Sequence, residues 1–181
     1  GCPVCEPCDF PRVYERDAIT VLRKIRNAWH WILLSFGEGM GLHSVSWRVN
    51  VSALDQIKLI EDSLKWIAGE KSSIEITKDK SFHGAEQFII VAKNMKKKDS
   101  RESLEKLGKD VLKELLENIQ LRIDEDKNFY VRLKLSELVK GEISLADRDT
   151  ISSTVKGKFK IESYPGDSTI DVISNLIKEL I

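Results

Sequence analysis

The feature that most constrains this fold is a strict alternation of apolar and polar residues over positions 44–51. Successive side chains of a β-strand point to opposite faces, so a period of two predicts a strand with one buried and one exposed face. Residues 129–135 and 155–161 repeat the pattern and predict two more half-exposed strands. The continuous apolar run from Phe88 to Ala92 is typical of a central strand covered on both faces.

Helical periodicity fills the intervals between these strands. Apolar residues recur every three or four positions over 54–67, between Ser52 as the expected N-cap and Gly69 as the expected C-cap. A single longer helix is predicted over 100–119, with Ser100 as its cap. The order is strand, helix, two strands, helix and then strands. It predicts an α+β fold with a mostly antiparallel sheet and helices packed on one face.

We expect three regions along the chain. Residues 42–166 carry the sheet pattern, and residues 167–181 form a C-terminal helix. In residues 1–39, the apolar positions of 13–36 repeat with helical spacing and predict an amphipathic helix, more typical of packing on protein than on a membrane. Glycines around Met40 end that helix and form a linker. Met40 directly before the main domain suggests either an N-terminal extension or a start site at that position.

Charge composition limits how this chain can bind a polyanion. Lys+Arg and Asp+Glu both number 29 among the 181 residues, so the formal net charge is zero. A strong polyanion binder usually carries a basic excess. Any nucleic-acid binding must therefore come from local patches.

The sequence favours a cytoplasmic protein without membrane contact. Its apolar runs, such as Trp31–Leu34 and Phe88–Ala92, are far shorter than the ~20 residues that span a bilayer. The N-terminus lacks a basic region leading into an apolar core, so no secretory signal is visible. All three cysteines lie within the first eight residues, which leaves the main domain without a disulfide framework.

Cys2, Cys5 and Cys8 are the candidate metal ligands. Zinc is usually held by four ligands, of which one Cys-x-x-Cys turn supplies two. No second such pair follows, and no recognised spacing adds His30 or His43. The simpler interpretation is an exposed segment whose thiols bind nothing. We therefore expect no cofactor, with zinc at these cysteines and redox chemistry as alternatives.

Motifs for catalysis are scarce. The three histidines do not fall into a Ser-His-Asp or Cys-His arrangement, and the glycines at 37, 39 and 41 are not those of a P-loop or dinucleotide fingerprint. The acidic runs at 124–126 and 147–149 are most simply charged turns. We expect a protein that is not an enzyme.

Basic side chains form the more suggestive pattern. Alternate residues of a strand lie ~6.6 Å apart on one face, close to the phosphate spacing of a nucleic-acid strand. A row of lysines on the strand at 155–161 is thus suited to tracking a backbone, although lysines also keep a sheet edge soluble. The candidate contacts are Lys93, Lys96, Lys97, Lys98, Arg132, Lys134, Lys156, Lys158 and Lys160.

The order of these segments over about residues 42–165 resembles an archaeal family of predicted exosome-associated RNA-binding proteins. The similarity lies in the first strand, in Ser81-Phe-His-Gly84 ahead of the apolar strand, in the following lysine-rich turn, and in the acidic turn before the Tyr130-x-Arg132 strand. Ala85-Glu86 stands where the family usually has Asn-Pro.

The resemblance implies a fold like that of a large-subunit ribosomal protein and a non-catalytic role in binding RNA of the ribosomal or transfer class. It also implies exosome or ribosomal proteins as partners. His83 and Gly84 would shape a loop, and the basic residues would contact phosphates. The alternative is a protein–protein adaptor in an RNA-processing or ribosomal assembly, without direct RNA contact.

Overall fold

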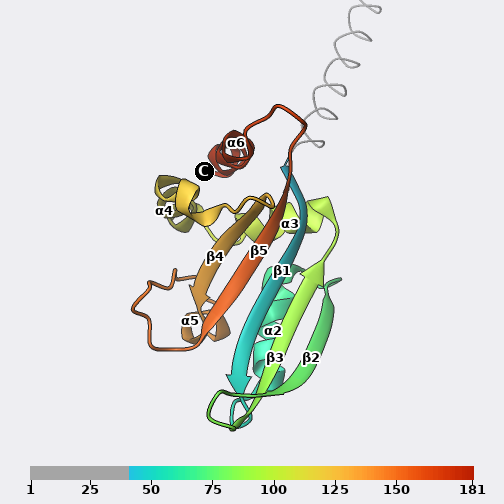
Figure 1. Ribbon diagram of the computed structural model, residues 1–181, viewed down its shortest axis with the longest axis vertical. Coiled ribbons are helices and arrows are strands. Elements are labelled where there is room, and N and C mark those ends of the chain that lie inside the picture. Colours follow the sequence, from blue (N-terminus) through green and yellow to red (C-terminus); the bar gives the residue numbers. More distant parts are fainter. Residues whose placement is uncertain (1–40) are drawn as a thin grey trace, which may run out of the picture. The chain divides into compact units, whose positions relative to one another are not determined.

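The computed structural model describes residues 41–181, which contain one five-stranded antiparallel sheet with helices (Figure 1). The strand order is β2-β3-β1-β5-β4. The strands are β1 (Gly41–Ser52), β2 (Ser73–Lys80), β3 (Glu86–Asn94), β4 (Asn128–Lys134) and β5 (Thr154–Glu162). The helices are α2 (Ile57–Ala68), α3 (Lys97–Glu105), α4 (Lys109–Glu117), the short 3₁₀ helix η1 (Ile119–Arg122), α5 (Leu135–Val139) and α6 (Thr169–Leu180).

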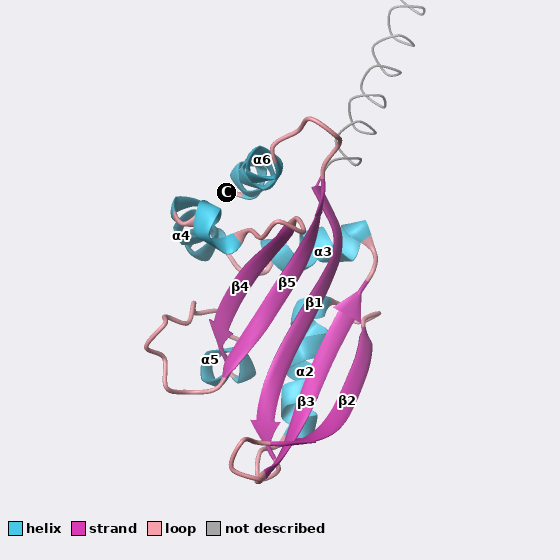
Figure 2. Ribbon diagram, viewed as in Figure 1, coloured by secondary structure: helices cyan, strands magenta, loops and turns pink. Residues whose placement is uncertain are grey.

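The predicted α+β class is confirmed. Figure 2 shows α2 behind the sheet, and the odd-numbered residues 45–51 of β1, 129–133 of β4 and 155–161 of β5 turn towards this side and are buried. The even-numbered residues within these stretches face the other side, where no described helix packs. We call this second side the open face.

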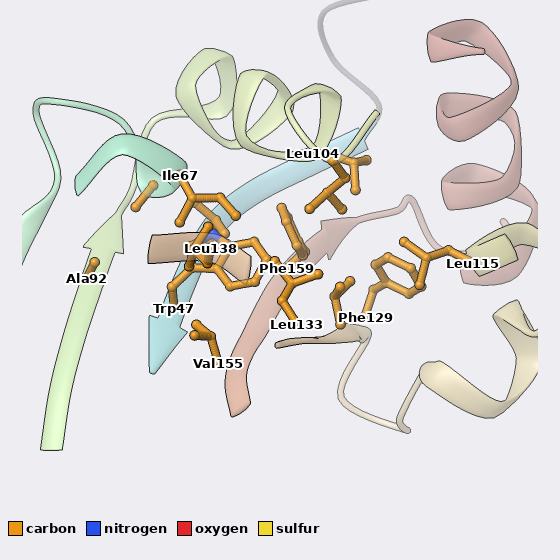
Figure 3. Close-up of a cluster of buried hydrophobic side chains, with 14 of the residues drawn as sticks. Trp47, Ile67, Ala92, Leu104, Leu115, Phe129, Leu133, Leu138, Val155 and Phe159 are labelled. Carbon is orange, nitrogen blue, oxygen red and sulfur yellow. The ribbon is translucent and has the colours of Figure 1, made fainter. Parts of the chain in front are cut away.

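The core is organised around Trp47 in the central strand β1 (Figure 3). Its indole N–H donates a 2.9 Å hydrogen bond to the Ser103 hydroxyl of α3, and its ring meets Phe159 of β5 edge-on at a centroid distance of 5.6 Å. Gly157 lies directly opposite Trp47 in the sheet register. A Cβ at Gly157 would approach the Trp47 ring to 2.5 Å, so the indole occupies the space that only glycine leaves open.

The helix after β1 begins later than predicted. The chain continues as strand through Ser52, and α2 starts at Ile57, with Leu54 fully outside it and exposed. Ser52 donates its backbone N–H to the Asp55 carboxylate at 2.8 Å, which forms a turn instead of a helix cap. The hydrogen bond between Ser52 and Asp55 competes with the start of a helix at Ser52, because short polar side chains favour such local turns. The predicted end of this helix at Gly69 is confirmed.

The single long helix predicted over 100–119 is wrong, because the structure has two helices there. Gly108 adopts a φ of 84° between α3 and α4, a conformation that ends a right-handed helix. Ser100 is not a cap: it lies inside α3, where its hydroxyl donates to the Lys96 carbonyl at 2.9 Å. Two short helices can follow the twisted sheet more closely than one straight helix of that length.

The apolar strand β3 lies inside the sheet, between β2 and β1, but it is covered on one face only. Ile90 and Ala92 are buried on the helical side. Ile89 and Val91 lie on the open face and are half-buried. The expectation that this run is covered on both faces is therefore wrong, because the neighbouring strands alone shield its second row of side chains.

Helix α6 packs against α4 and belongs to the same compact unit as the sheet. The amphipathic helix predicted at 13–36 and the cysteines at 2, 5 and 8 lie outside the described residues. Over the described part of the chain, no helix has both the length and the apolar character needed to cross a membrane.

The contact between Trp47 and Gly157 predicts the effect of one methyl group. We expect Gly157→Ala to destabilise the protein by about 1–3 kcal/mol, because the new Cβ forces the buried indole to move. The free energy of unfolding measured by chemical denaturation tests this. In the background of Trp47→Leu, which removes the ring, the same glycine substitution should cost much less. Equal costs in both backgrounds would contradict this account of the contact.

Candidate nucleic-acid interface

Three cations form one row across the open face. In the sheet register, Lys156 of β5 lies directly between Arg132 of β4 and Arg48 of β1. Neighbouring strands are about 4.8 Å apart, so three positive charges share a narrow strip. We call Arg132, Lys156 and Arg48 the basic row.

The basic row lacks compensating charge. Among the described residues, none of its three members forms an ion pair with a carboxylate, although seven other ion pairs link described residues. Like charges directly opposite one another destabilise a sheet. Stability of the free protein therefore does not account for this arrangement, and the positive charge would attract an anion.

A second row lies one step along the strands. It contains Tyr130 of β4, Lys158 of β5, Ser46 of β1 and Lys93 of β3. Lys93 is partly neutralised, since its ammonium lies 3.2 Å from the Glu75 carboxylate of β2. Lys158 has no such acidic partner among the described residues. Tyr130 thus places an aromatic ring beside a free ammonium and next to the basic row.

The acidic turn before β4 fixes the position of Tyr130. The Tyr130 hydroxyl donates to Asp124 at 2.8 Å, while Asn128 donates to the same carboxylate from its backbone N–H at 2.8 Å and from its side chain at 2.9 Å. The bonds from the Asn128 side chain are the main cause that lowers the pKa of Asp124 to about 2. The same carboxylate raises the pKa of Tyr130. A tyrosine held at its hydroxyl presents its ring in one orientation.

Lys160 and Lys134 lie towards the two ends of the open face. Lys160 donates to the backbone carbonyl of Asp126, inside the acidic turn. Phosphate would be repelled by the carboxylates there, so Lys160 is less suited to binding RNA than its neighbours on β5. Lys134 is the last residue of β4, and its backbone N–H donates to the Ser144 carbonyl.

The lysines that precede and begin α3 are separate from the basic row. Lys96 is the N-cap residue of α3, and Lys97 and Lys98 are in its first turn. Lys97 pairs with the Glu162 carboxylate at the end of β5. The structure therefore brings together the predicted residues Arg132, Lys156 and Lys158, and it leaves this second lysine group beyond the end of β3.

His83 and Gly84 lie in the turn of the β2–β3 hairpin. Gly84 has a φ of 81°, a conformation that favours glycine, and its N–H donates to the Ser81 carbonyl at 2.8 Å. The neighbouring Phe82 is fully exposed and meets the His83 ring edge-on at 5.4 Å. This turn joins β2 and β3, which lie on one side of β1. Arg132 and Lys156 of the basic row lie on strands on the other side of β1.

A hollow of about 380 Å³ opens beside the basic row. All three cations of the row line it, and the rest of its lining is uncharged and polar. Its other lining residues are Asn50, Ser152, Ser153 and Thr154. The segment that enters β5 thus supplies hydroxyl groups next to a concentration of positive charge.

Two residues of this surface were not among the predicted contacts. Arg48 and Tyr130 occupy polar positions of the alternating strands, which the sequence does show. Their proximity to Lys156 and Lys158 depends on which strands pair and in what register. A single sequence carries little information on that long-range pairing.

Cys2, Cys5 and Cys8, the predicted zinc ligands, lie outside the described residues. Within residues 41–181, no group of three or more His, Cys, Asp or Glu side chains could hold a metal ion.

A sheet face with arginine, lysine and an accessible aromatic ring is typical of surfaces that bind nucleic acid. Comparison with known proteins agrees with this class. A family model described as RNA binding matches residues 44–161, and the chain belongs to this family. A comparison with curated proteins finds no match.

Solved structures of archaeal proteins share the fold. A DUF54 protein from Methanothermobacter thermautotrophicus superposes with a TM-score of 0.64 at 18% identity, covering 77% of this chain and 98% of that one. A DUF54 protein from Archaeglobus fulgidus superposes with a TM-score of 0.61 at 20% identity, covering 77% of this chain and 99% of that one. One from Sulfolobus solfataricus superposes with a TM-score of 0.56 at 16% identity, covering 76% of this chain and 93% of that one. At these identities the likeness is one of fold.

The unpaired basic row predicts a gain in stability when one charge is removed. We expect Lys156→Gln to raise the free energy of unfolding by a few tenths of a kcal/mol to about 1 kcal/mol at low salt. The gain should shrink at high salt, because screening weakens the repulsion. Lys93→Gln is the matched control on the same face, and it should be neutral or slightly destabilising because Lys93 has Glu75 as a partner. Equal effects of both substitutions would contradict the repulsion.

The hydrogen bonds to the Asp124 carboxylate predict that the free energy of unfolding depends on pH. The pKa of Asp124 is lowered from an ordinary 3.8 to about 2, so its stabilising effect is complete above pH 3.8 and is lost as the pH falls through about 2. Asp124→Ala should therefore be less stable than the parent near neutral pH, and the two unfolding free energies should converge in acid. Glu125→Ala, in the same turn and exposed, is the control. A difference that stays constant down to pH 2 would show that the carboxylate charge does not matter.

Proposed function

We propose that this protein binds RNA without catalysing a reaction, and that it does so through the open face of its sheet. The observation that carries the proposal is the basic row, where Arg132, Lys156 and Arg48 lie side by side without acidic partners among the described residues. Membership of the RNA-binding family supports the same conclusion. Phosphate groups would supply the charge that the free protein lacks.

The two rows suggest how RNA would lie. Residues two apart on a strand are about 6.6 Å apart, which approaches the spacing of successive phosphates. Lys156 and Lys158 of β5 would contact neighbouring phosphates, and the Tyr130 ring would stack on an unpaired base. Stacking needs a base that is free of a duplex. We therefore propose single-stranded or looped RNA, of the ribosomal or transfer class, as the ligand.

The cellular setting is a further part of the proposal. The resemblance described above points to archaeal RNA processing beside the exosome, or to the ribosome, and to the cytoplasm. The alternative is an adaptor that contacts proteins only. In favour of the adaptor, α2 exposes Leu59 and Trp66 to about 45% of their full area, and such apolar side chains are typical of protein interfaces.

Electrophoretic binding of the full chain to ribosomal and transfer RNA, over a range of salt, tests RNA binding. We expect Lys156→Gln and Lys158→Gln each to weaken binding about tenfold, the loss typical of one charge-assisted hydrogen bond. Each should also reduce the slope of log affinity against log salt by about 1.

Lys160→Gln is the matched control, since it changes the same residue type on the same strand beside the acidic turn. It should weaken binding by less than about twofold, well below the tenfold step of one lost charged contact. Losses below about twofold in all three variants would move the contact surface away from the basic row, whereas a tenfold loss in Lys160→Gln as well would extend the contact along β5 to the acidic turn. If the unmodified chain binds neither RNA at low salt, RNA binding is excluded and the adaptor is favoured.

A further inference from the structure

We infer that the hollow beside the basic row binds the terminal phosphate monoester of an RNA strand, and so recognises an RNA end. This inference rests on the proposed function and adds a specificity to it. The hollow of about 380 Å³ is lined by Arg48, Arg132 and Lys156 together with four uncharged polar residues. Ligand pockets range over about 300–1,000 Å³, so it has room for a phosphoryl group with its attached sugar.

The charge of the hollow exceeds what a phosphate inside a chain can balance. A phosphodiester carries one negative charge, whereas a phosphate monoester carries about −1.5 to −2 at neutral pH. Three cations line the hollow, no carboxylate lines it, and none of the three is paired within the described residues. A terminal phosphate is the RNA group whose charge comes closest to matching this set.

The hydrogen-bonding groups match the same ligand. A monoester presents three terminal oxygens, and a diester presents two. Two arginines offer planar guanidinium groups that bind phosphate oxygens in pairs. Hydroxyl groups of Ser152, Ser153 and Thr154 and the Asn50 amide also line the hollow, so donors are available for every oxygen.

The position of the hollow favours the end of an RNA strand over its middle as the ligand. Two of the lining residues, Ser152 and Ser153, come from the segment that leads into β5, whereas the second row lies further along the open face. An RNA strand that lies along Lys158 and Tyr130 would reach the hollow with its last phosphate. The chain segment at 152–153 then borders the site on the side away from the RNA.

The experiment compares one single-stranded oligoribonucleotide of about ten nucleotides in three forms, a length within the usual range of single-strand sites. The forms carry a 5′-monophosphate, a 3′-monophosphate, or hydroxyls at both ends. Fluorescence anisotropy with the full chain measures their dissociation constants. We expect one phosphorylated form to bind about tenfold tighter than the hydroxyl form, and which one does so identifies the end.

Two variants locate the effect. Arg132→Gln, which changes a lining residue of the hollow, should bring the ratio of affinities close to one. Lys158→Gln, one row away and outside the hollow, should weaken all three forms by the same factor and leave the ratio unchanged. Both residues are exposed, so thermal unfolding should show folded proteins. Arg48→Gln provides a second test if Arg132→Gln fails to fold.

Equal affinity for all three forms would overturn the inference and leave RNA binding itself intact. A preference for a phosphorylated end that survives both arginine substitutions would also overturn it, because the monoester would then bind elsewhere. Failure of all three forms to bind, together with ribosomal and transfer RNA, would overturn both this inference and the proposed function.

Discussion

The packing of Trp47 against Gly157 is the contact on which the rest of this structure depends. Trp47 is in the central strand, its indole fills the space left by a missing side chain on β5, and its N–H reaches Ser103 of α3. One buried residue thereby fixes the pairing of two strands and the position of a helix. A buried indole needs a partner for its N–H, so the hydrogen bond to Ser103 also specifies which helix covers this part of the sheet.

Because a strand alternates, the same residues that build the core leave the other face available for binding. Gly157 lies between Lys156 and Lys158, and Trp47 lies between Ser46 and Arg48. The core contacts therefore determine the register in which the charges of β1, β5 and β4 meet. The repulsion within the basic row is tolerated because the apolar side of the same three strands is fully buried. Binding surfaces commonly carry such local costs, and the remainder of the fold offsets them.

Much of the fold could be predicted from the sequence, whereas the site could be predicted only in part. Alternation in β1, β4 and β5 identifies the strands, the order of elements gives the α+β class, and Gly69 correctly ends α2. Two predicted details were wrong because local interactions compete with helix formation. The Asp55 side chain forms a turn after Ser52, and Gly108, with its left-handed backbone, divides the helix predicted over 100–119. Lys156 and Lys158 are evident in the sequence, but the partnership with Arg48 and Tyr130 requires the pairing of β1, β5 and β4. That pairing joins residues far apart along the chain, and no local pattern reports it.

The sheet topology also has a consequence for synthesis. Strand β1 is the first described strand to leave the ribosome, and β5, one of its two neighbours, is the last. Pairing of β1 with β3 closes a shorter loop than pairing of β1 with β5. A three-stranded intermediate of β1, β3 and β2 can therefore form early. In that intermediate the second edge of β1 is open, and Trp47 still lacks the strand on which it packs. Unpaired strand edges promote association with other chains. Among the strands that end up inside the sheet, the one that anchors the finished core is thus the one that stays unprotected longest while the chain is being made.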